Sequence, residues 1–227
     1  MVAPLRPVGQ LALGAQIAGD LREQIILQRI PAGTHLAEEL LAGSYDVSRG
    51  PIRDALRQLE SEGFIESRKR GSYVLPFTTE DIVDLYSLRE AIEGLAVQRA
   101  VEQAEPADWD AFDELVEAMS AAARDHDASR FAAADVTFHQ RLYQMSHHRR
   151  LVGVWSQYEP ILAGLLRVTV SVDEDLEPIA HDHAQLLRLL RAGASELLDR
   201  EIRTHVRGSR DRMIQAYEQT IQLASAH

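Results

Sequence analysis

Asp135 and His139 have the types and the spacing of a pair of metal ligands. On a helix, residues four apart share one face, so a carboxylate and an imidazole at these positions can bind the same divalent ion. An Asp and a His at this spacing occur by chance more often than as ligands. The pair therefore indicates a metal site only if further donors can be brought to the same point.

Two further histidines can be placed by counting residues. His183 precedes Gly193 by ten residues, and His205 follows Ser195 by ten. If Gly193 ends one helix and Ser195 caps the next, both histidines lie about 15 Å from the turn of an antiparallel hairpin, at the same height. One carboxylate and three imidazoles suit Zn, Ni, Mn or Fe(II), with positions left open for water or a ligand. His181 is an alternative to His183, but it is two residues away and would face elsewhere.

The first third of the chain has cations at positions suited to DNA. Arg49 and Arg53 are four residues apart in the first turns of a predicted helix whose N-cap is Ser48. Such a helix can insert its N-terminus into a major groove, where the two side chains reach bases and the free N–H groups bind a phosphate. Taken singly, the Arg pair could be a solvated helix face and the basic turn that follows an ordinary hairpin. The turn, suited to the DNA backbone or minor groove, contains Arg68, Lys69, Arg70 and Gly71.

The elements around these cations have the order of a winged helix-turn-helix. Apolar residues at helical spacing predict three helices, and two short β-like runs joined by the basic turn predict a hairpin. We therefore expect residues 10–77 to form a DNA-binding domain. The predicted helices are 10–30, 36–42 and 48–63, and the predicted strands are 64–67 and 72–75.

Residues 80–222 show no strand pattern and predict a second, all-α domain. The expected fold class is mainly α: a winged helix-turn-helix of three helices and a β-hairpin, followed by a bundle of six or seven helices. The helical stretches are 80–104, 107–124, 128–146, 149–170, 175–192 and 195–222.

Charge and composition restrict the function classes. Residues 1–77 contain nine basic and nine acidic side chains, so the rest of the chain carries the whole net charge of -11. An acidic domain repels DNA, so any DNA contact must come from the first domain. The absence of cysteine excludes a disulfide scaffold, an iron–sulfur protein and thiol chemistry. No apolar run reaches the roughly 18 residues of a membrane span and no signal peptide is evident, so we expect a cytoplasmic protein with no membrane partner.

The DNA-binding half resembles the GntR-type winged helix. This resemblance implies that Ser48, Arg49, Arg53 and Gly71 contact operator DNA. Glu39 is a departure, since the family commonly has an Arg there that touches DNA. The motifs that carry the resemblance are LAE at 36–38, VSRGPIRDAL at 47–56 and RGSYV at 70–74.

The helical half is similar to the FCD-type effector domain of the FadR subfamily. The resemblance implies that Asp135, His139, His183 and His205 bind a divalent metal, with zinc expected first and nickel, manganese or iron as alternatives. It also implies that the metal receives a small carboxylate effector. His148 replaces a usual Asn and is expected to touch a helix start. The matching segments are DIVDLYSLREAIE at 81–93, DVTFH at 135–139, HAQLL at 183–187 and His205.

Arg89 is the candidate for binding the carboxylate of the effector, because an Arg among apolar helix positions needs a partner. The alternative partner is Glu93, one turn further along, in an ordinary ion pair. Arg167, Trp155 and Tyr158 are weaker candidates for a pocket, since such aromatic residues more often belong to the core.

These features predict a sequence-specific, DNA-binding transcriptional regulator, expected to be a repressor, and not an enzyme. We expect a homodimer that binds palindromic operator DNA and is controlled by a small organic acid at the metal. Two rival readings remain. One is a metalloenzyme in which the Asp/His3 site activates water, although no catalytic residues are identified. The other is a DNA-binding regulator with a purely structural metal and no effector.

Overall fold

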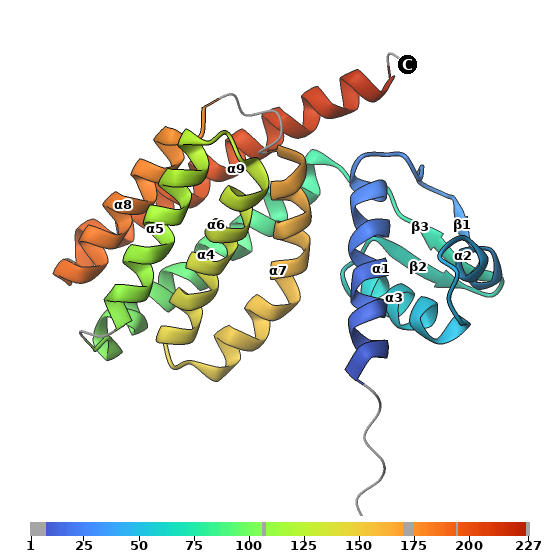
Figure 1. The fold of residues 1–227 in the computed structure, drawn as a ribbon, viewed down its shortest axis with the longest axis horizontal. Helices are drawn as coiled ribbons and strands as arrows, with labels where there is room; N and C mark the ends of the chain where they lie inside the picture. Colours follow the sequence, from blue (N-terminus) through green and yellow to red (C-terminus); the bar gives the residue numbers. More distant parts are fainter. Residues whose placement is uncertain (1–7, 106–107, 170–174, 194, 226–227) are drawn as a thin grey trace, which may run out of the picture. The chain divides into compact units, whose positions relative to one another are not determined.

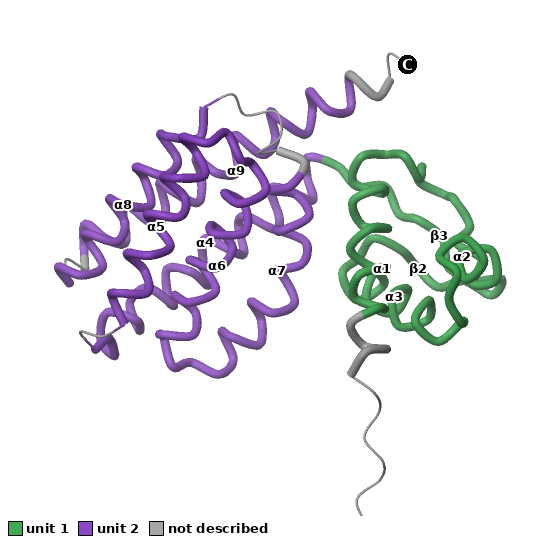
Figure 2. The backbone as a smooth tube through the Cα atoms, viewed as in Figure 1, with its two compact units in different colours: residues 1–78, 223–227 green, residues 79–222 purple. Residues whose placement is uncertain are grey.

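The computed structural model describes residues 8–105, 108–169, 175–193 and 195–225. The chain divides into two compact units, residues 1–78 with 223–227 and residues 79–222 (Figure 2). Within the described ranges, no helix has the length and hydropathy needed to cross a bilayer.

The first unit contains three helices and a small antiparallel sheet (Figure 1). The strand order in the sheet is first, third, second, so the last strand lies in the middle. The elements are α1 (Val8–Ile26), β1 (His35–Leu36), α2 (Glu38–Ser44), α3 (Arg49–Ser61), β2 (Ile65–Arg68) and β3 (Gly71–Val74).

Helices α1 and α3 pack closely against each other, and α3 also contacts α2 and β2. A Cβ on Gly14 of α1 would lie 3.1 Å from the Cβ of Asp54 and 3.3 Å from the carbonyl oxygen of Pro51, so the helices approach where a side chain is missing. Near the other end of α1, the Arg22 guanidinium donates two hydrogen bonds of 2.7 Å to the two carboxylate oxygens of Glu62. This buried ion pair joins α1 to the end of α3.

The sheet differs from the prediction in one strand. His35 and Leu36 pair with Tyr73 and Ser72 of β3, so Leu36 belongs to a strand and not to the predicted helix 36–42. A strand of two residues is too short to show the alternation that identifies strands in a sequence. Its formation depends on the partner strand, which lies more than thirty residues later in the chain.

The second unit is all helical, within the part of the chain that the structure describes. Helix α6 packs against α4, α5 and α7, and α8 packs against α5. The mainly helical fold class that the sequence predicted is confirmed. The six helices are α4 (Thr79–Gln103), α5 (Asp108–Arg124), α6 (Ala128–Met145), α7 (Arg149–Thr169), α8 (Glu177–Ala192) and α9 (Ser195–Ser225).

Several helices of the second unit begin or end at residues whose types favour a helix end. Asp127 caps α6 by accepting a hydrogen bond of 2.9 Å from the N–H of Arg130. Gly193 ends α8 in the left-handed conformation, with φ of 64°. His148 lies at the start of α7, where its Nδ1 accepts a 3.2 Å hydrogen bond from the N–H of Leu151. The expectation that His148 touches a helix start therefore agrees with the structure.

Candidate metal centre and nucleic-acid interface

Three histidines from three helices meet in the core of the second unit. His139 of α6, His183 of α8 and His205 of α9 are all buried. The Nε2 atom of His139 lies 3.4 Å from that of His183 and 3.3 Å from that of His205. A tetrahedral site with Zn–N bonds of about 2.0–2.1 Å separates its nitrogens by about 3.3 Å. The spacing of these imidazoles therefore fits a bound metal ion.

Asp135 completes the predicted set of four. It lies one turn before His139 on α6 and is buried. Its Oδ1 atom is 2.9 Å from Nε2 of His183. The structure thus gathers the three predicted histidines in one group and places the predicted Asp135 against one of them, His183.

The outward contacts of two rings leave their Nε2 atoms facing the centre. Nδ1 of His183 lies 2.8 Å from the carbonyl oxygen of Ile179, which can only accept, so this nitrogen is the donor and Nε2 is the atom that faces the cluster. Nδ1 of His139 lies 2.5 Å from Oε1 of Glu93. That contact is close but lacks the angle of a hydrogen bond, so both atoms also count as buried and unsatisfied. Lone pairs that converge on one point are the donor set of a cation site.

The surroundings of Asp135, His139 and His205 favour their deprotonated forms. Burial lowers the pKa of His139, although the charge of Glu93 partly opposes this. Burial, and then the neighbouring His183, lower the pKa of His205 well below its ordinary value. Burial would raise the pKa of Asp135, but its contact with the His183 ring holds that pKa below the ordinary range. Because metals bind the deprotonated forms, all three groups are ready for a metal.

Arg89 and Glu93 form a buried ion pair on α4. Arg89 is 3% exposed and Glu93 is 0% exposed. Nε of Arg89 donates a 2.8 Å hydrogen bond to Oε2 of Glu93, so the alternative partner considered for Arg89 is present. Burial would raise the pKa of Glu93, but Arg89 and then His139 lower it below its ordinary range. The contact of Glu93 with His139 was not predicted from the sequence. The spacing of Arg89 and Glu93 along one helix does not reveal which other helix their side chains face.

Polar atoms without hydrogen bonds lie around the histidines. The hydroxyl of Tyr143, Nε1 of Trp155 and Nδ1 of His205 are buried and unsatisfied. The Tyr143 and Trp155 rings stack at 4.7 Å, and the Trp155 ring lies 6.4 Å from that of His139. Of the predicted pocket residues, Trp155 thus lies beside the cluster. Among the others, Tyr158 is half-buried and Arg167 is exposed.

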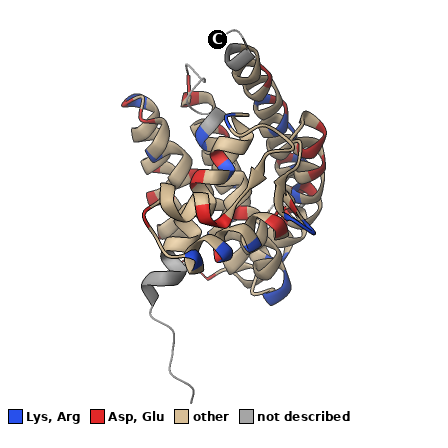
Figure 3. Ribbon diagram, turned by 90° about the vertical axis from the view of Figure 1, so that its right-hand side faces the viewer, with Lys and Arg blue, Asp and Glu red and all other residues tan. Residues whose placement is uncertain are grey.

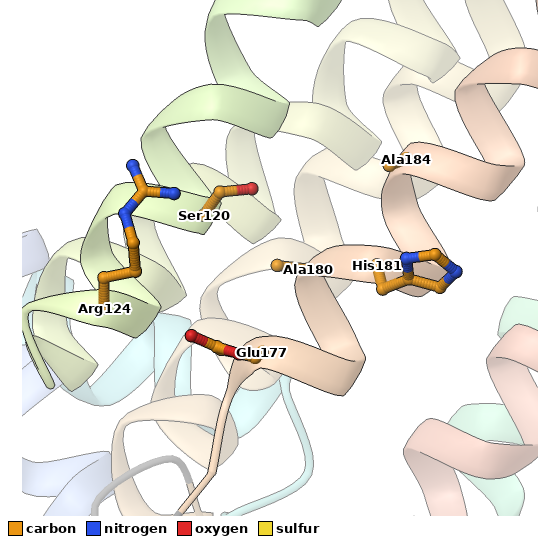
Figure 4. Close-up of a pocket in the computed structure, with 6 residues that line it drawn as sticks. All are labelled: Ser120, Arg124, Glu177, Ala180, His181 and Ala184. Carbon is orange, nitrogen blue, oxygen red and sulfur yellow. The ribbon is translucent and has the colours of Figure 1, made fainter.

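A cavity of about 320 Å³ opens between α5 and α8 (Figure 4). Ser120 and Arg124 line it from α5, and Glu177 and His181 line it from α8. A cavity of this size could hold a small molecule. Arg124, however, is ion-paired within its own helix, and Glu177 adds a carboxylate that disfavours an anion. His181 lines this cavity and is not part of the histidine cluster, so it does not replace His183 there.

The predicted DNA-contacting residues of α3 are exposed but paired with acidic residues. Ser48 occupies the N-cap position, and its hydroxyl makes no capping hydrogen bond. Arg49 lies 3.2 Å from a carboxylate oxygen of Glu39, and Arg53 lies 2.8 Å from one of Glu38. Both guanidinium groups thus bind carboxylates of α2. Figure 3 colours the basic and acidic positions along the ribbon.

The hairpin carries the predicted basic residues at its exposed end. Arg68 pairs with Gly71 at the end of the strands, so it belongs to β2 and only Lys69 and Arg70 form the turn. The guanidinium of Arg68 lies 4.8 Å above the ring of Tyr73. Gly71 has a φ of 124°, and a Cβ there would collide with the ring of His35. A glycine is therefore required at this point of the wing.

Two family models match the chain. Residues 13–75 match the model of bacterial regulatory proteins of the gntR family, and residues 84–208 match the FCD domain. The chain is 26% identical over 197 residues to the gluconate operon transcriptional repressor of Bacillus subtilis (strain 168), covering 84% of this chain and 81% of that protein. It is 28% identical over 195 residues to a probable D-xylose utilization operon transcriptional repressor of Paenarthrobacter nicotinovorans, covering 84% and 85%.

The fold has solved counterparts. The superposition on the structure of E. coli McbR/YncC covers 96% of this chain and 100% of the E. coli chain, with a TM-score of 0.72 and 21% sequence identity. The matched families and the named relatives are regulators and not enzymes, which confirms the expectation that this chain is no enzyme. By these matches, the chain belongs to the GntR family of bacterial regulatory proteins and has an FCD domain as its second part.

Proposed function

We propose that this protein is a transcriptional repressor whose DNA binding is controlled by a small organic acid at a metal site in the helical domain. The observation that carries the proposal is the buried meeting of Asp135 with His139, His183 and His205 in a chain that also has a winged helix. The named relatives are repressors, which supports the direction of control.

Residues 10–77 are the proposed DNA-binding domain. The exposed first turn of α3 would enter a major groove, with Arg49 and Arg53 toward bases and Ser48 toward a phosphate. The wing would contact the DNA backbone or minor groove with Arg68, Lys69, Arg70 and Gly71. A DNA-binding regulator of this kind would act in the cytoplasm.

Residues 80–222 are the proposed effector domain. Asp135 and the three histidines would hold a divalent metal, with zinc expected first and nickel, manganese or iron as alternatives. When bound, the metal would supply a Lewis acid for an oxygen of the effector. The packing of α6 against α4, α5 and α7 holds Asp135 and His139 in place.

The effector is proposed to be a small carboxylic acid. Arg89 is buried beside the cluster and would bind the carboxylate through its guanidinium, of which Glu93 uses the Nε–H. The unsatisfied Tyr143 hydroxyl and Trp155 N–H would donate to oxygens of the same ligand. One relative is named for gluconate, itself a small organic acid, which agrees with this class.

The protein is proposed to bind a palindromic operator as a homodimer. Leu88 and Leu95 on α4 are 37% and 43% exposed, and such apolar residues on a long helix suit a contact between subunits. Effector binding would favour one arrangement of the dimer and move the two winged helices away from the spacing of the half-sites. The metal and the effector would thereby change the proportion of dimers in the DNA-binding arrangement, without any chemical reaction.

Elemental analysis of purified protein tests the metal site. We expect about one transition metal per chain in the wild type and a loss of metal in His139→Ala and His183→Ala. His181→Ala is the matched control, since His181 is exposed and lines a different cavity. Absence of metal after reconstitution of the wild type would overturn the site.

A mobility-shift experiment tests the control of DNA binding. DNA from upstream of the gene and its neighbours would be titrated with the metal-loaded dimer, and carboxylic acids that raise the melting temperature would then be added. Release of the DNA by such an acid supports the proposal. If no carboxylic acid changes the DNA binding of the metal-loaded protein, the metal has a structural role only.

A further inference from the structure

The Glu93 carboxylate is divided between two buried partners. Its Oε2 atom accepts the 2.8 Å hydrogen bond from Nε of Arg89, and its Oε1 atom lies 2.5 Å from Nδ1 of His139. The side chain is 0% exposed, so water does not replace either contact.

Another buried Arg–Glu pair, Arg22 with Glu62, is arranged differently. In the first unit, Arg22 binds Glu62 through both carboxylate oxygens, each at 2.7 Å. Glu93 instead gives one oxygen to Arg89 and turns the other toward His139. A role confined to neutralising Arg89 would not require the second oxygen to face an imidazole.

We infer that Glu93 is a positioning residue for the metal site, which orients His139 and raises its affinity for the ion. The negative charge of a carboxylate beside Nδ1 favours a proton on that nitrogen, which leaves Nε2 as the ligand atom. It also makes the imidazole a stronger donor. Because Arg89 holds the other oxygen, Glu93 connects a metal ligand to the residue proposed to bind the effector. The inference rests on the metal site of the proposed function.

The test measures metal affinity in the full chain carrying Glu93→Gln. This substitution keeps the shape of the side chain but removes its charge and replaces one oxygen by an amide N–H₂. Zn²⁺ would be titrated in competition with a chromophoric chelator, and the metal-free melting temperature would be recorded. We expect a Zn²⁺ affinity about 10–100-fold below that of the wild type.

Glu62→Gln is the matched control, because it alters a buried Arg–Glu pair that touches no histidine of the cluster. It should lower the melting temperature and leave the Zn²⁺ affinity of the second unit unchanged. If Glu93→Gln also changes only the melting temperature, Glu93 has a structural role alone and the inference is wrong. If the wild type binds no Zn²⁺, the proposed metal site itself fails, which is a distinguishable result.

A second measurement needs no variant that might fold poorly. Long-range ¹H–¹⁵N spectra of the metal-free wild type identify which ring nitrogen of each histidine carries the proton. We expect His139 as the tautomer protonated at Nδ1. A His139 protonated at Nε2 alone would overturn the inference.

Discussion

One Arg–Glu pair of the first unit and one of the second have opposite surroundings. In the first unit, Arg49 contacts Glu39 where the two side chains are 55% and 82% exposed. In the second, Arg89 contacts Glu93 where the side chains are 4% and 0% exposed. An exposed pair contributes about 0–1 kcal/mol and exchanges readily with other ions. A buried pair cannot separate without leaving a charge out of water.

This difference in burial suits different tasks. A cation that must contact DNA has to be able to leave its carboxylate for a phosphate or a base, and the exposed pairs of α3 allow this. A side chain that orients a metal ligand, as proposed for Glu93, must stay in one position, and Glu93 is buried and held by Arg89. The first unit also contains a buried pair, Arg22 with Glu62, which joins α1 to the end of α3 and is not exposed to DNA.

The largest expected effect is on stability when the buried pair is broken. Glu93→Ala leaves Arg89 buried without its partner, so we expect a loss of about 3–5 kcal/mol in the free energy of unfolding. Glu39→Ala breaks an exposed pair and should change the free energy by less than about 1 kcal/mol. Chemical denaturation measures both, and similar losses in the two variants would contradict the comparison.

Metal removal should affect the second unit alone. With free metal at about one hundred times the dissociation constant, a native-state ligand adds about 2.7 kcal/mol of stability. We expect this gain in the wild type and its absence in His205→Ala. Hydrogen exchange would locate the gain, which should raise protection in α6 and α8 while α1 and α3 stay unchanged. A uniform increase over both units would argue against a local site.

Loss of a DNA-facing cation should weaken binding without changing the fold. We expect Arg49→Ala and Arg53→Ala each to lower operator affinity by about 1–3 kcal/mol, the range of a base contact. Arg124→Ala is the control, because Arg124 forms a similarly exposed pair with Glu117 in the other unit. An equal loss in the control would show that the effect depends on net charge and not on position.

The smallest expected effect concerns Glu39. Replacing this carboxylate by an amide in Glu39→Gln frees Arg49 and removes a negative charge near the phosphates, so DNA binding should tighten several-fold at low salt. The gain should shrink as salt is raised, because the charges are screened. Fluorescence anisotropy over a range of salt concentrations measures this. Weaker binding by the variant would instead indicate that Glu39 contacts a base directly.

Local sequence signals were enough to predict most of the helices. The repeat of apolar residues and the breaks between them predicted the stretch 128–146, and the structure has α6 at Ala128–Met145. The same signals missed β1, because a two-residue strand has no pattern of its own. They also set Arg68 in the turn, whereas pairing with Gly71 places it in the strand.

The candidate metal site could be predicted from the sequence to an unusual extent. Asp135 and His139 share a face by helix geometry, and the equal distances of His183 and His205 from the Gly193 turn set them at one height. Glu93 could not be connected to the site in the same way. Its contact with His139 depends on how α4 packs against α6, and the spacing of residues along the chain does not predict that packing.

By itself the sequence determined the mainly helical fold, the family, and which residue types lie one helical turn apart, because these depend on short-range geometry and on motifs. Only the tertiary structure decided which partners those residues meet. Glu39 and Glu38 pair with Arg49 and Arg53 because α2 packs against α3. Glu93 meets His139 because α4 packs against α6. Contacts between helices follow from the packing of whole faces, which is a property of the folded chain and not of any single segment.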